Sequence, residues 1–170
     1  MLRLLIVRHA VAEEREQFAR NGGDDSLRPL TREGKIKMEQ IARGLRKAAG
    51  KVEVVATSPF LRAAQTARVV AAACGGEVQI IDSLIPTARP STFLTWLREY
   101  GPTDGTVAVV GHEPHLGVLA TWLMTGSRDS HVGLEKGGAC MLEIEKQPGA
   151  RSATMIWLLT PRALEQLSAR

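Results

Sequence analysis

Short apolar runs that alternate with amphipathic stretches constrain the fold of this 170-residue chain more than any other feature of its sequence. The run at residues 4–7 is uninterrupted, partly β-branched and too short for a helix, which indicates a strand buried on both faces. Similar runs follow at residues 52–57 and 106–110, with helical periodicity between them. Strands that alternate with helices predict an α/β fold, a compact three-layer α/β/α sandwich around a mainly parallel sheet.

The amphipathic stretches supply the helices of this sandwich. Thr31 is placed to cap a helix that ends at Gly50, because Met38, Ile41 and Leu45 recur at three- and four-residue steps. We also expect helices over residues 58–73, over residues 92–100 with Ser91 as the cap, after Pro114 and after Pro161, and strands over residues 77–81, 139–145 and 154–159. The polar stretch at residues 10–29 is expected to be a loop with room for one short helical piece.

Length and composition favour one domain over residues 1–170. The chain has 44% apolar and 24% charged residues, which is ordinary for a globular protein. Its net charge of +4 and its pI of about 9.4 raise the question of a nucleic-acid partner. However, charges of both signs are interleaved and only 4% of residues are aromatic, so the sequence shows no phosphate-tracking stripe and no base-stacking surface. A basic surplus around one pocket would instead attract a phosphorylated substrate.

Cysteine usage and the start of the chain bear on the compartment. Cys74 and Cys140 are too few for a disulfide framework and lack metal-site spacing, so we expect two buried apolar groups. The first apolar run is too short to span a membrane and no small-residue cleavage site follows it, which favours a cytoplasmic protein without a membrane partner. We expect neither a metal nor a cofactor. The sequence does not determine the oligomeric state, for which we expect a monomer.

Polar groups follow three of the predicted strands, at the end of the sheet where open α/β folds bind ligands. Arg8 and His9 follow the first strand, residues 58–62 the second, and His112 the third. An isolated Arg-His pair usually lies on the protein surface at the end of a strand and has no role in a site. Here an otherwise apolar strand would hardly end in two groups that are costly to desolvate unless they faced a cavity or had partners. The three groups are therefore candidates for one shared site.

The second and third groups each have an alternative reading. Arg62 lies in the first turn of a predicted helix, where it either faces solvent or binds an anion together with the helix amides. His112 and His115 have the spacing of a metal-binding pair. Such a pair needs further carboxylate or imidazole ligands, and the chain has four histidines in total, so we do not predict a metal site.

The sequence closely resembles the histidine phosphatase superfamily, and within it the small phosphohistidine phosphatases of the SixA type. The resemblance covers nearly the whole chain. It rests on Arg8-His9-Ala10, on Arg28-Pro29-Leu30-Thr31 with Glu33-Gly34, on the block from Ser58 to Thr66, and on Gly111-His112-Glu113-Pro114. Four motifs in this order and at this spacing make the resemblance specific.

The resemblance implies a site and a mechanism. It makes His9 the residue that is transiently phosphorylated, with Arg8, Arg62 and His112 around the phosphoryl group. A neutral imidazole is a competent nucleophile, and two guanidiniums with a protonated His112 would stabilise the charge on the phosphoryl oxygens. Ser58 is a further candidate for phosphate binding. Arg28 either holds the substrate at the pocket rim or pairs with Asp24 or Asp25 of its own loop.

Two departures from the family pattern bear on the substrate. Ala10 replaces the glycine that many relatives have after the nucleophile. More telling, residues 84–87 hold no acidic side chain where larger relatives place a general acid, and the chain has no room for a large inserted lid. A phosphoramidate needs such an acid less, because its P–N bond breaks readily once the nitrogen is protonated. Glu113 is the preferred substitute acid, beside Glu13 and Glu14, although it equally suits a helix N-terminus.

These inferences favour a metal-independent phosphohistidine phosphatase that acts on a signalling protein, such as a phosphotransfer domain. A second hypothesis keeps the mechanism and changes the substrate to a small phosphorylated metabolite. A third is a non-catalytic module that binds phosphorylated partners, and the presence of both histidines and both arginines argues against it. The fourth, a nucleic-acid binder, would need a basic face that the dispersed charges do not supply.

Overall fold

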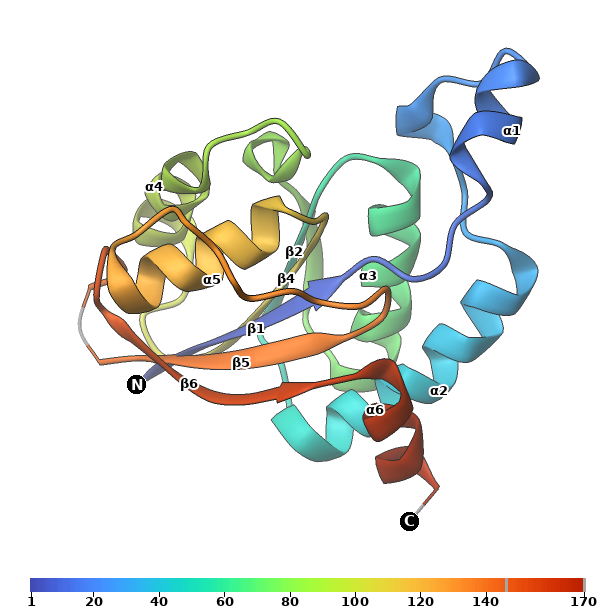
Figure 1. The fold of residues 1–170 in the computed structure, drawn as a ribbon. Helices are drawn as coiled ribbons and strands as arrows, with labels where there is room; N and C mark the ends of the chain where they lie inside the picture. The colour runs from blue at the N-terminus through green and yellow to red at the C-terminus, as the bar shows by residue number, and fades with distance from the viewer. Residues whose placement is uncertain (146, 170) are drawn as a thin grey trace.

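The computed structural model describes residues 1–145 and 147–169, which form a six-stranded sheet with helices on both faces (Figure 1). The strands are β1 (Leu2–Arg8), β2 (Val54–Thr57), β3 (Glu77–Ile80), β4 (Gly105–Gly111), β5 (Ala139–Ile144) and β6 (Ala153–Leu159). The helices are α1 (Arg15–Arg20), α2 (Arg32–Ala49), α3 (Leu61–Cys74), α4 (Pro90–Tyr100), α5 (His115–Thr125) and α6 (Pro161–Ser168), with short 3-10 turns η1 (Asp25–Leu27) and η2 (Asp82–Leu84). The predicted α/β sandwich is confirmed.

The strands follow the order β3-β2-β4-β1-β5-β6. Strands β3, β2, β4 and β1 run parallel, while β5 is antiparallel to β1 and β6 is antiparallel to β5. The sheet is therefore mainly parallel, as predicted. Its two central strands end together, because Arg8 of β1 pairs with Gly111 of β4. This register brings the two histidine motifs together at the carboxyl ends of the two central strands.

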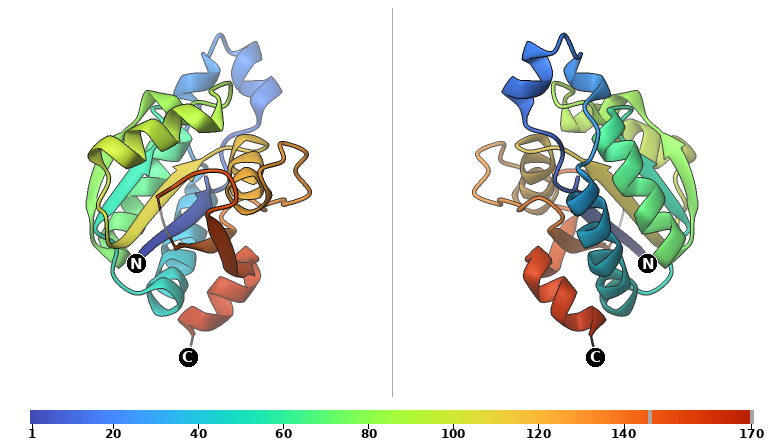
Figure 2. Two further views of the ribbon diagram at one scale, coloured as in Figure 1. Left: turned by 90° about the vertical axis from the view of Figure 1, so that its left-hand side faces the viewer. Right: turned by 90° about the vertical axis from the view of Figure 1, so that its right-hand side faces the viewer.

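The alternation of side chains along β1 feeds two separate cores. Leu5 and Val7 pack in the core beneath α2, α3 and α6, whereas Leu4 and Ile6 pack in the core beneath α4 and α5. All four side chains are fully buried, and each contributes roughly 1.5–3 kcal/mol of burial free energy. The two views in Figure 2 show the helices on opposite faces of the sheet. A strand buried on both faces explains why the run at residues 4–7 is continuous rather than alternating.

Helix starts show where local patterns succeed and fail. Thr31 caps α2 as predicted, with its hydroxyl accepting a bond from the Gly34 N–H at 2.9 Å. The prediction that Ser91 caps α4 is wrong, because α4 begins at Pro90 with Arg89 as its cap residue. Proline lacks an N–H that the first turn would leave unpaired, and its φ already suits a helix.

The segment between β1 and α2 extends beyond the carboxyl end of β1 and carries α1 and η1 (Figure 1). An isolated bridge between Ala12 and Leu30 closes its base. On the other side, residues 81–89 connect β3 to α4 with only the short turn η2, so the expectation of no large inserted lid holds. No helix in the described part of the chain is long and apolar enough to cross a membrane.

Candidate active site

A cavity of about 530 Å³ lies at the carboxyl ends of β1 and β4, beside the first turn of α3. Its lining includes the residues that the sequence predicts to form one site, namely Arg8, His9, Arg28, Arg62 and His112. The rim adds Glu13, Glu14, Arg15 and Lys136, all exposed. The fold thus brings residues of all four sequence motifs together around one cavity.

His9 lies just after β1 and is almost completely buried. Its Nδ1 is 2.7 Å from the carbonyl oxygen of Ala10. A carbonyl only accepts, so Nδ1 carries the hydrogen and Nε2 carries the lone pair. Burial, together with the charges of Arg62 and other nearby arginines, lowers the pKa of His9 to about 4, although the Ala10 bond acts in the opposite direction. At neutral pH His9 is therefore an uncharged imidazole with a free Nε2.

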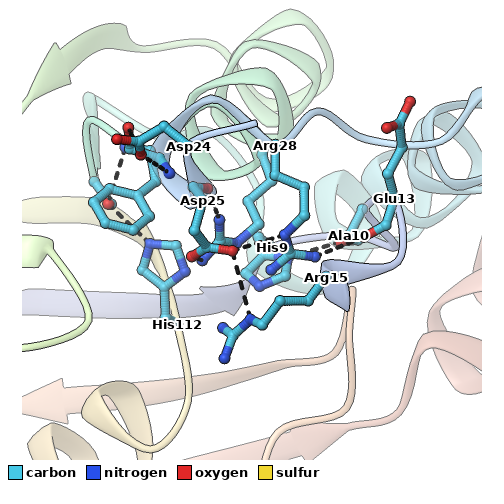
Figure 3. Close-up of polar contacts among 12 residues, drawn as sticks. His9, Ala10, Glu13, Arg15, Asp24, Asp25, Arg28 and His112 are labelled. Carbon is cyan, nitrogen blue, oxygen red and sulfur yellow. Dashed lines mark hydrogen bonds and ion pairs between the residues drawn. The ribbon is translucent and has the colours of Figure 1, made fainter. Parts of the chain in front are cut away.

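His112 faces His9 with 5.2 Å between the ring centroids (Figure 3). Its Nε2 is 2.9 Å from the Ser58 hydroxyl, which also accepts a bond from the Phe60 N–H at 3.3 Å. The buried hydroxyl has no other acceptor for its own hydrogen among the described residues, so it donates to Nε2, which leaves the ring hydrogen of His112 on Nδ1. Burial, the charge that His9 carries once it is protonated below about pH 4, and the charge of Arg62 lower the pKa of His112 to about 3. In the free site His112 is therefore a neutral donor, and a protonated His112 beside a bound phosphoryl group stays a prediction.

Ser58 has a different place from the one expected. Its side chain is fully buried and its hydroxyl is directed to His112 Nε2. It acts on the ring that lines the cavity rather than on a ligand within the cavity. The prediction that Ser58 itself contacts phosphate is replaced by one in which it sets the tautomer of His112.

Two arginines complete the wall of the cavity. Arg8 donates through Nη1 to the carbonyl oxygen of Leu134 at 2.7 Å. Arg62 is only 1% exposed, so the alternative of a solvent-facing arginine is wrong. Its Nη1 donates to the Asp25 carbonyl oxygen at 2.8 Å and its Nη2 to the Asp25 carboxylate at 3.1 Å. Its guanidinium also lies over the Phe60 ring, 5.1 Å from the centroid.

Three buried N–H groups on these walls lack a hydrogen-bond partner among the described residues. They are Arg8 Nε, Arg62 Nε and His112 Nδ1. A buried donor without a partner costs roughly 1–3 kcal/mol, and more when the group is charged. Because all three side chains line one cavity with two fixed positive charges, the site is built for an anion with several acceptor oxygens.

Arg28 is almost fully buried and is held within its own loop. Its Nε donates to the Asp25 carboxylate at 2.9 Å and its Nη1 to the Glu13 carbonyl oxygen at 2.7 Å. The structure thus shows the intraloop pairing that the sequence left open. Asp25 was considered only as a partner of Arg28. Sequence spacing gave no sign that it also binds Arg62, which lies 37 positions further along the chain.

Two of the three candidate acids are bonded elsewhere, and the third points away from the nucleophile. Glu113 accepts the Leu134 N–H at 2.9 Å and the Gly117 N–H at 3.2 Å, which is the helix-terminal role considered for it. Glu14 caps α1 by accepting the Gln17 N–H at 3.0 Å. The Glu13 carboxylate is exposed and points away from His9 (Figure 3).

Thr66 supports the nucleophile and was not singled out by sequence reasoning. Its hydroxyl donates to the Arg62 carbonyl oxygen at 2.7 Å and accepts the Ala10 N–H at 3.0 Å. It thereby fixes the peptide whose carbonyl oxygen orients His9. The signal available in the sequence was a hydroxyl one helical turn after Arg62.

No group of three or more His, Cys, Asp and Glu side chains in the described residues is arranged to hold a metal ion. The cysteines lie outside the site, since Cys74 packs in the core beneath α2 and Cys140 in the core beneath α5. Burial raises the pKa of Cys74 to about 11 and that of Cys140 to about 12. Both are buried free thiols, as predicted.

Comparisons with known proteins agree with this geometry. The model of the histidine phosphatase superfamily (branch 1) matches residues 4–86. An uncharacterized protein of Picosynechococcus sp. is 34% identical over 139 residues, which cover 81% of this chain and 82% of that protein. The structure of the protein histidine phosphatase SixA complexed with tungstate is similar with a TM-score of 0.80 and 23% identity, over 95% of this chain and 99% of that one.

A proposed alpha-ribazole-5'-P phosphatase from Escherichia coli K-12 has the same fold, with a TM-score of 0.73 and 21% identity over 94% of this chain and 97% of that one. The SixA type and a small-molecule phosphatase are therefore both similar to this chain in architecture. Together with the motifs and the cavity, these matches show that the chain belongs to the histidine phosphatase superfamily.

Proposed function

We propose that this phosphatase removes the phosphoryl group from phosphohistidine in a signalling protein, such as a phosphotransfer domain, through a covalent intermediate on His9. One observation carries the proposal. A neutral His9 with a free Nε2 shares a cavity with three buried, unpartnered N–H donors. The nitrogen can attack phosphorus while the donors bind the oxygens on which negative charge accumulates.

The reaction proceeds in two displacements. The Nε2 lone pair forms a bond to phosphorus as the bond from phosphorus to the leaving group breaks. Water then attacks phosphorus, the P–Nε2 bond returns its electron pair to His9, and the proton that water loses leaves with the products. Arg8, Arg62 and the Nδ1–H of His112 stabilise the phosphoryl oxygens in both steps.

None of the three candidate acids is placed to protonate a leaving group, which supports a leaving group that needs none of them. Glu113 and Glu14 are bonded to backbone N–H groups, and Glu13 points away from His9. An alcohol leaves poorly without a proton donor. A phosphohistidine ring that has taken up a proton on its other nitrogen leaves as neutral imidazole, so the substrate itself supplies the proton. The proposed reaction therefore requires neither a metal nor a dedicated acid.

The similar SixA structure supports an oxyanion as the occupant of this cavity. That protein was solved with tungstate, a tetrahedral oxyanion like phosphate. A second substrate class remains a candidate because an alpha-ribazole-5'-P phosphatase is proposed for a protein of the same fold. The cavity here has a rim of exposed charged side chains, and the short connection at residues 81–89 leaves its mouth without a large cover, which favours a protein substrate.

A paired assay tests the proposal. The wild type and His9→Ala are incubated with a phosphohistidine protein and with a generic phosphomonoester, each with and without a chelator. We expect chelator-resistant phosphate release that is much faster from the phosphohistidine protein and absent in His9→Ala. Rapid quenching followed by peptide mass analysis should place the intermediate phosphate on His9.

The matched control is His131→Ala, because His131 is exposed and lies outside the cavity. It should retain wild-type release. Preference for a small phosphomonoester would transfer the assignment to the metabolite hypothesis. Equal release from the wild type and His9→Ala would remove His9 as the nucleophile and favour the binding-module hypothesis.

A further inference from the structure

Asp25 occupies the centre of an arginine cluster at the edge of the cavity, although it does not line the cavity itself. Its carboxylate accepts bonds from Arg28 Nε at 2.9 Å and Arg62 Nη2 at 3.1 Å, and lies 3.5 Å from Arg15 Nε. Dashed lines in Figure 3 join it to Arg15 and Arg28. One carboxylate therefore connects a residue of the phosphoryl site to two arginines of the loop before α2.

The bonds from Arg62 to Asp25 use one edge of the guanidinium only. Nη1 and Nη2 form the end of the planar group and both donate to Asp25, to the carbonyl oxygen and the carboxylate respectively. The Nε–H lies on the side edge, and it has no partner among the described residues. The guanidinium is planar and its donors are fixed relative to one another, so binding of Nη1 and Nη2 by Asp25 also determines the direction of the Nε–H bond. The side edge belongs to a side chain that lines the cavity.

The charge of Asp25 also allows the arginines to gather. Partial burial raises the pKa of its carboxyl, but the Arg28 bond and the charges of Arg62, Arg28 and Arg15 outweigh burial and lower it below its usual range. Asp25 is therefore ionised at neutral pH. Without it, Arg62 and Arg28 would be two like charges close together in a partly desolvated site.

Asp25 is in turn fixed by its surroundings. It opens η1, which Asp24 caps by accepting the Ser26 N–H at 2.8 Å. Arg28, which holds the other carboxylate oxygen, is anchored to the Glu13 carbonyl oxygen at 2.7 Å. A chain of contacts thus runs from the loop backbone through Arg28 and Asp25 to Arg62.

We propose that Asp25 is the positioning residue of the phosphoryl site, which holds Arg62 by its end edge so that its Nε–H meets the transferring phosphoryl group, and that Arg28 acts through Asp25. This inference rests on the proposed function for its kinetic consequence alone. The orientation of Arg62 exists whether or not His9 forms a covalent intermediate.

The test compares Asp25→Asn, which keeps the shape and the backbone carbonyl, with Asp129→Asn, at an exposed residue that does not line the cavity. A misdirected guanidinium should lower kcat roughly 10- to 100-fold in Asp25→Asn. Two effects on phosphate affinity oppose each other: a less ordered Arg62 weakens binding, and the loss of the Asp25 negative charge strengthens it. The Kd for inorganic phosphate, measured by calorimetry, should therefore stay within about threefold of the wild type, at full stoichiometry. Asp129→Asn should match the wild type in both measurements.

Two results would overturn the proposal. One is a kcat of Asp25→Asn within about threefold of the wild type. The other is a parallel loss of kcat and phosphate-binding stoichiometry, which indicates a damaged fold and a merely structural role.

The role assigned to Arg28 is tested by a double-mutant cycle. If Arg28 acts through Asp25, the double variant D25N/R28Q should have a kcat within about threefold of Asp25→Asn alone. Independent contact of Arg28 with the substrate would instead make the two losses multiply, and would overturn this part of the proposal.

A spectroscopic readout separates this inference from the proposed function. In spectra of protein labelled with 15N-arginine, the Arg62 Nε–H signal should shift on addition of inorganic phosphate in the wild type, and should broaden or lose that shift in Asp25→Asn. The measurement needs no turnover, so it supports or rejects Asp25 as the positioning residue even where His9 proves not to be the nucleophile.

Discussion

The carboxyl ends of β1 and β4 are adjacent in the sheet and each presents one histidine to the same cavity, yet the two rings are prepared for opposite tasks. On the β1 side, the Ala10 carbonyl oxygen accepts a hydrogen bond from the Nδ1–H of His9, which leaves Nε2 with a lone pair. On the β4 side, the Ser58 hydroxyl donates to Nε2 of His112 and leaves a hydrogen on Nδ1. One ring can attack phosphorus and the other can donate to its oxygens.

The difference shows that the hydrogen-bond partner of each ring decides its role, because that partner determines which ring nitrogen carries the hydrogen. Burial does not distinguish the rings, since it affects both alike. Desolvation is the largest cause of the lowered pKa of His9 and of His112. Both are therefore neutral at pH 7, and neither role depends on a charged imidazole in the free site. The comparison predicts that changes to one ring alter nucleophilicity and changes to the other alter charge stabilisation.

The largest effect should come from breaking the β1 side. His9→Gln retains a polar side chain but supplies no nucleophile, so kcat should fall by roughly 1,000-fold or more. The three donors of the cavity remain, and inorganic phosphate should still bind within about threefold of the wild-type Kd. Kinetics and calorimetry on one preparation check both statements. Loss of phosphate binding along with kcat would contradict separate roles for the two rings.

The β4 side offers a matched pair of variants. In His112→Asn the side-chain amide can stand near the position of Nδ1, whereas in His112→Gln it stands near that of Nε2. Removal of a donor to a developing oxyanion costs roughly 100- to 1,000-fold in kcat, which we expect for His112→Gln. His112→Asn should lose about tenfold less. The reverse order would mean that Nε2 faces the phosphoryl group and that the tautomer is the other one.

Burial lowers the pKa of His115 as well, so stability should depend on pH through three buried histidines, with the largest part from the two rings of the site. The pKa values of those two rings are about 4 and 3 in the folded chain, below the value of 6.5 for a free histidine. The unfolded chain therefore binds protons first as pH falls below 6.5, and the free energy of unfolding decreases. Between pH 7 and pH 5 each of these two rings should cost about 2 kcal/mol. Urea unfolding at pH 7, 6 and 5 measures this slope.

His131→Ala is the control for this slope, because His131 is exposed and its removal should leave the pH dependence unchanged. His9→Gln should remove the part that His9 contributes, about 2 kcal/mol between pH 7 and pH 5, and leave the part from the other buried histidines. A carboxylate with a lowered pKa, such as Asp25, loses its contribution only below about pH 4 and does not enter this window. An unfolding free energy that is flat from pH 7 to pH 5 would show that the rings are not buried as neutral groups.

The sequence predicts the parts of this arrangement that depend on local pattern. The apolar run at residues 4–7 and the periodicity after Thr31 identify β1 and α2, and the rule for strand ends identifies His9 and His112 as one site. The start of α4 was missed by a small margin because Ser91 and Pro90 are both plausible first-turn residues, and the missing N–H of proline decided between them.

The parts that could not be predicted depend on contacts between distant residues. Ser58 meets His112 across 54 positions and Asp25 meets Arg62 across 37. A hydroxyl or carboxylate motif does not reveal its partner before the chain has folded. The neutral state of His112 in the free site could not be predicted for the same reason, because its pKa depends on burial and on the charges that the fold places around it.

The smallest effect should sharpen the comparison most, because it changes a tautomer and leaves both rings in place. Ser58→Ala removes the donor to His112 Nε2, so hydrogen can move from Nδ1 to Nε2 and the cavity loses a donor for part of the time. A net hydrogen bond is worth about 1 kcal/mol, so kcat should fall roughly fivefold to tenfold with a much smaller change in phosphate Kd. Ser91→Ala, at an exposed serine, is the control and should match the wild type. If Ser58→Ala instead weakens phosphate binding as much as it lowers kcat, Ser58 contacts the phosphate itself and the original prediction for this residue is restored.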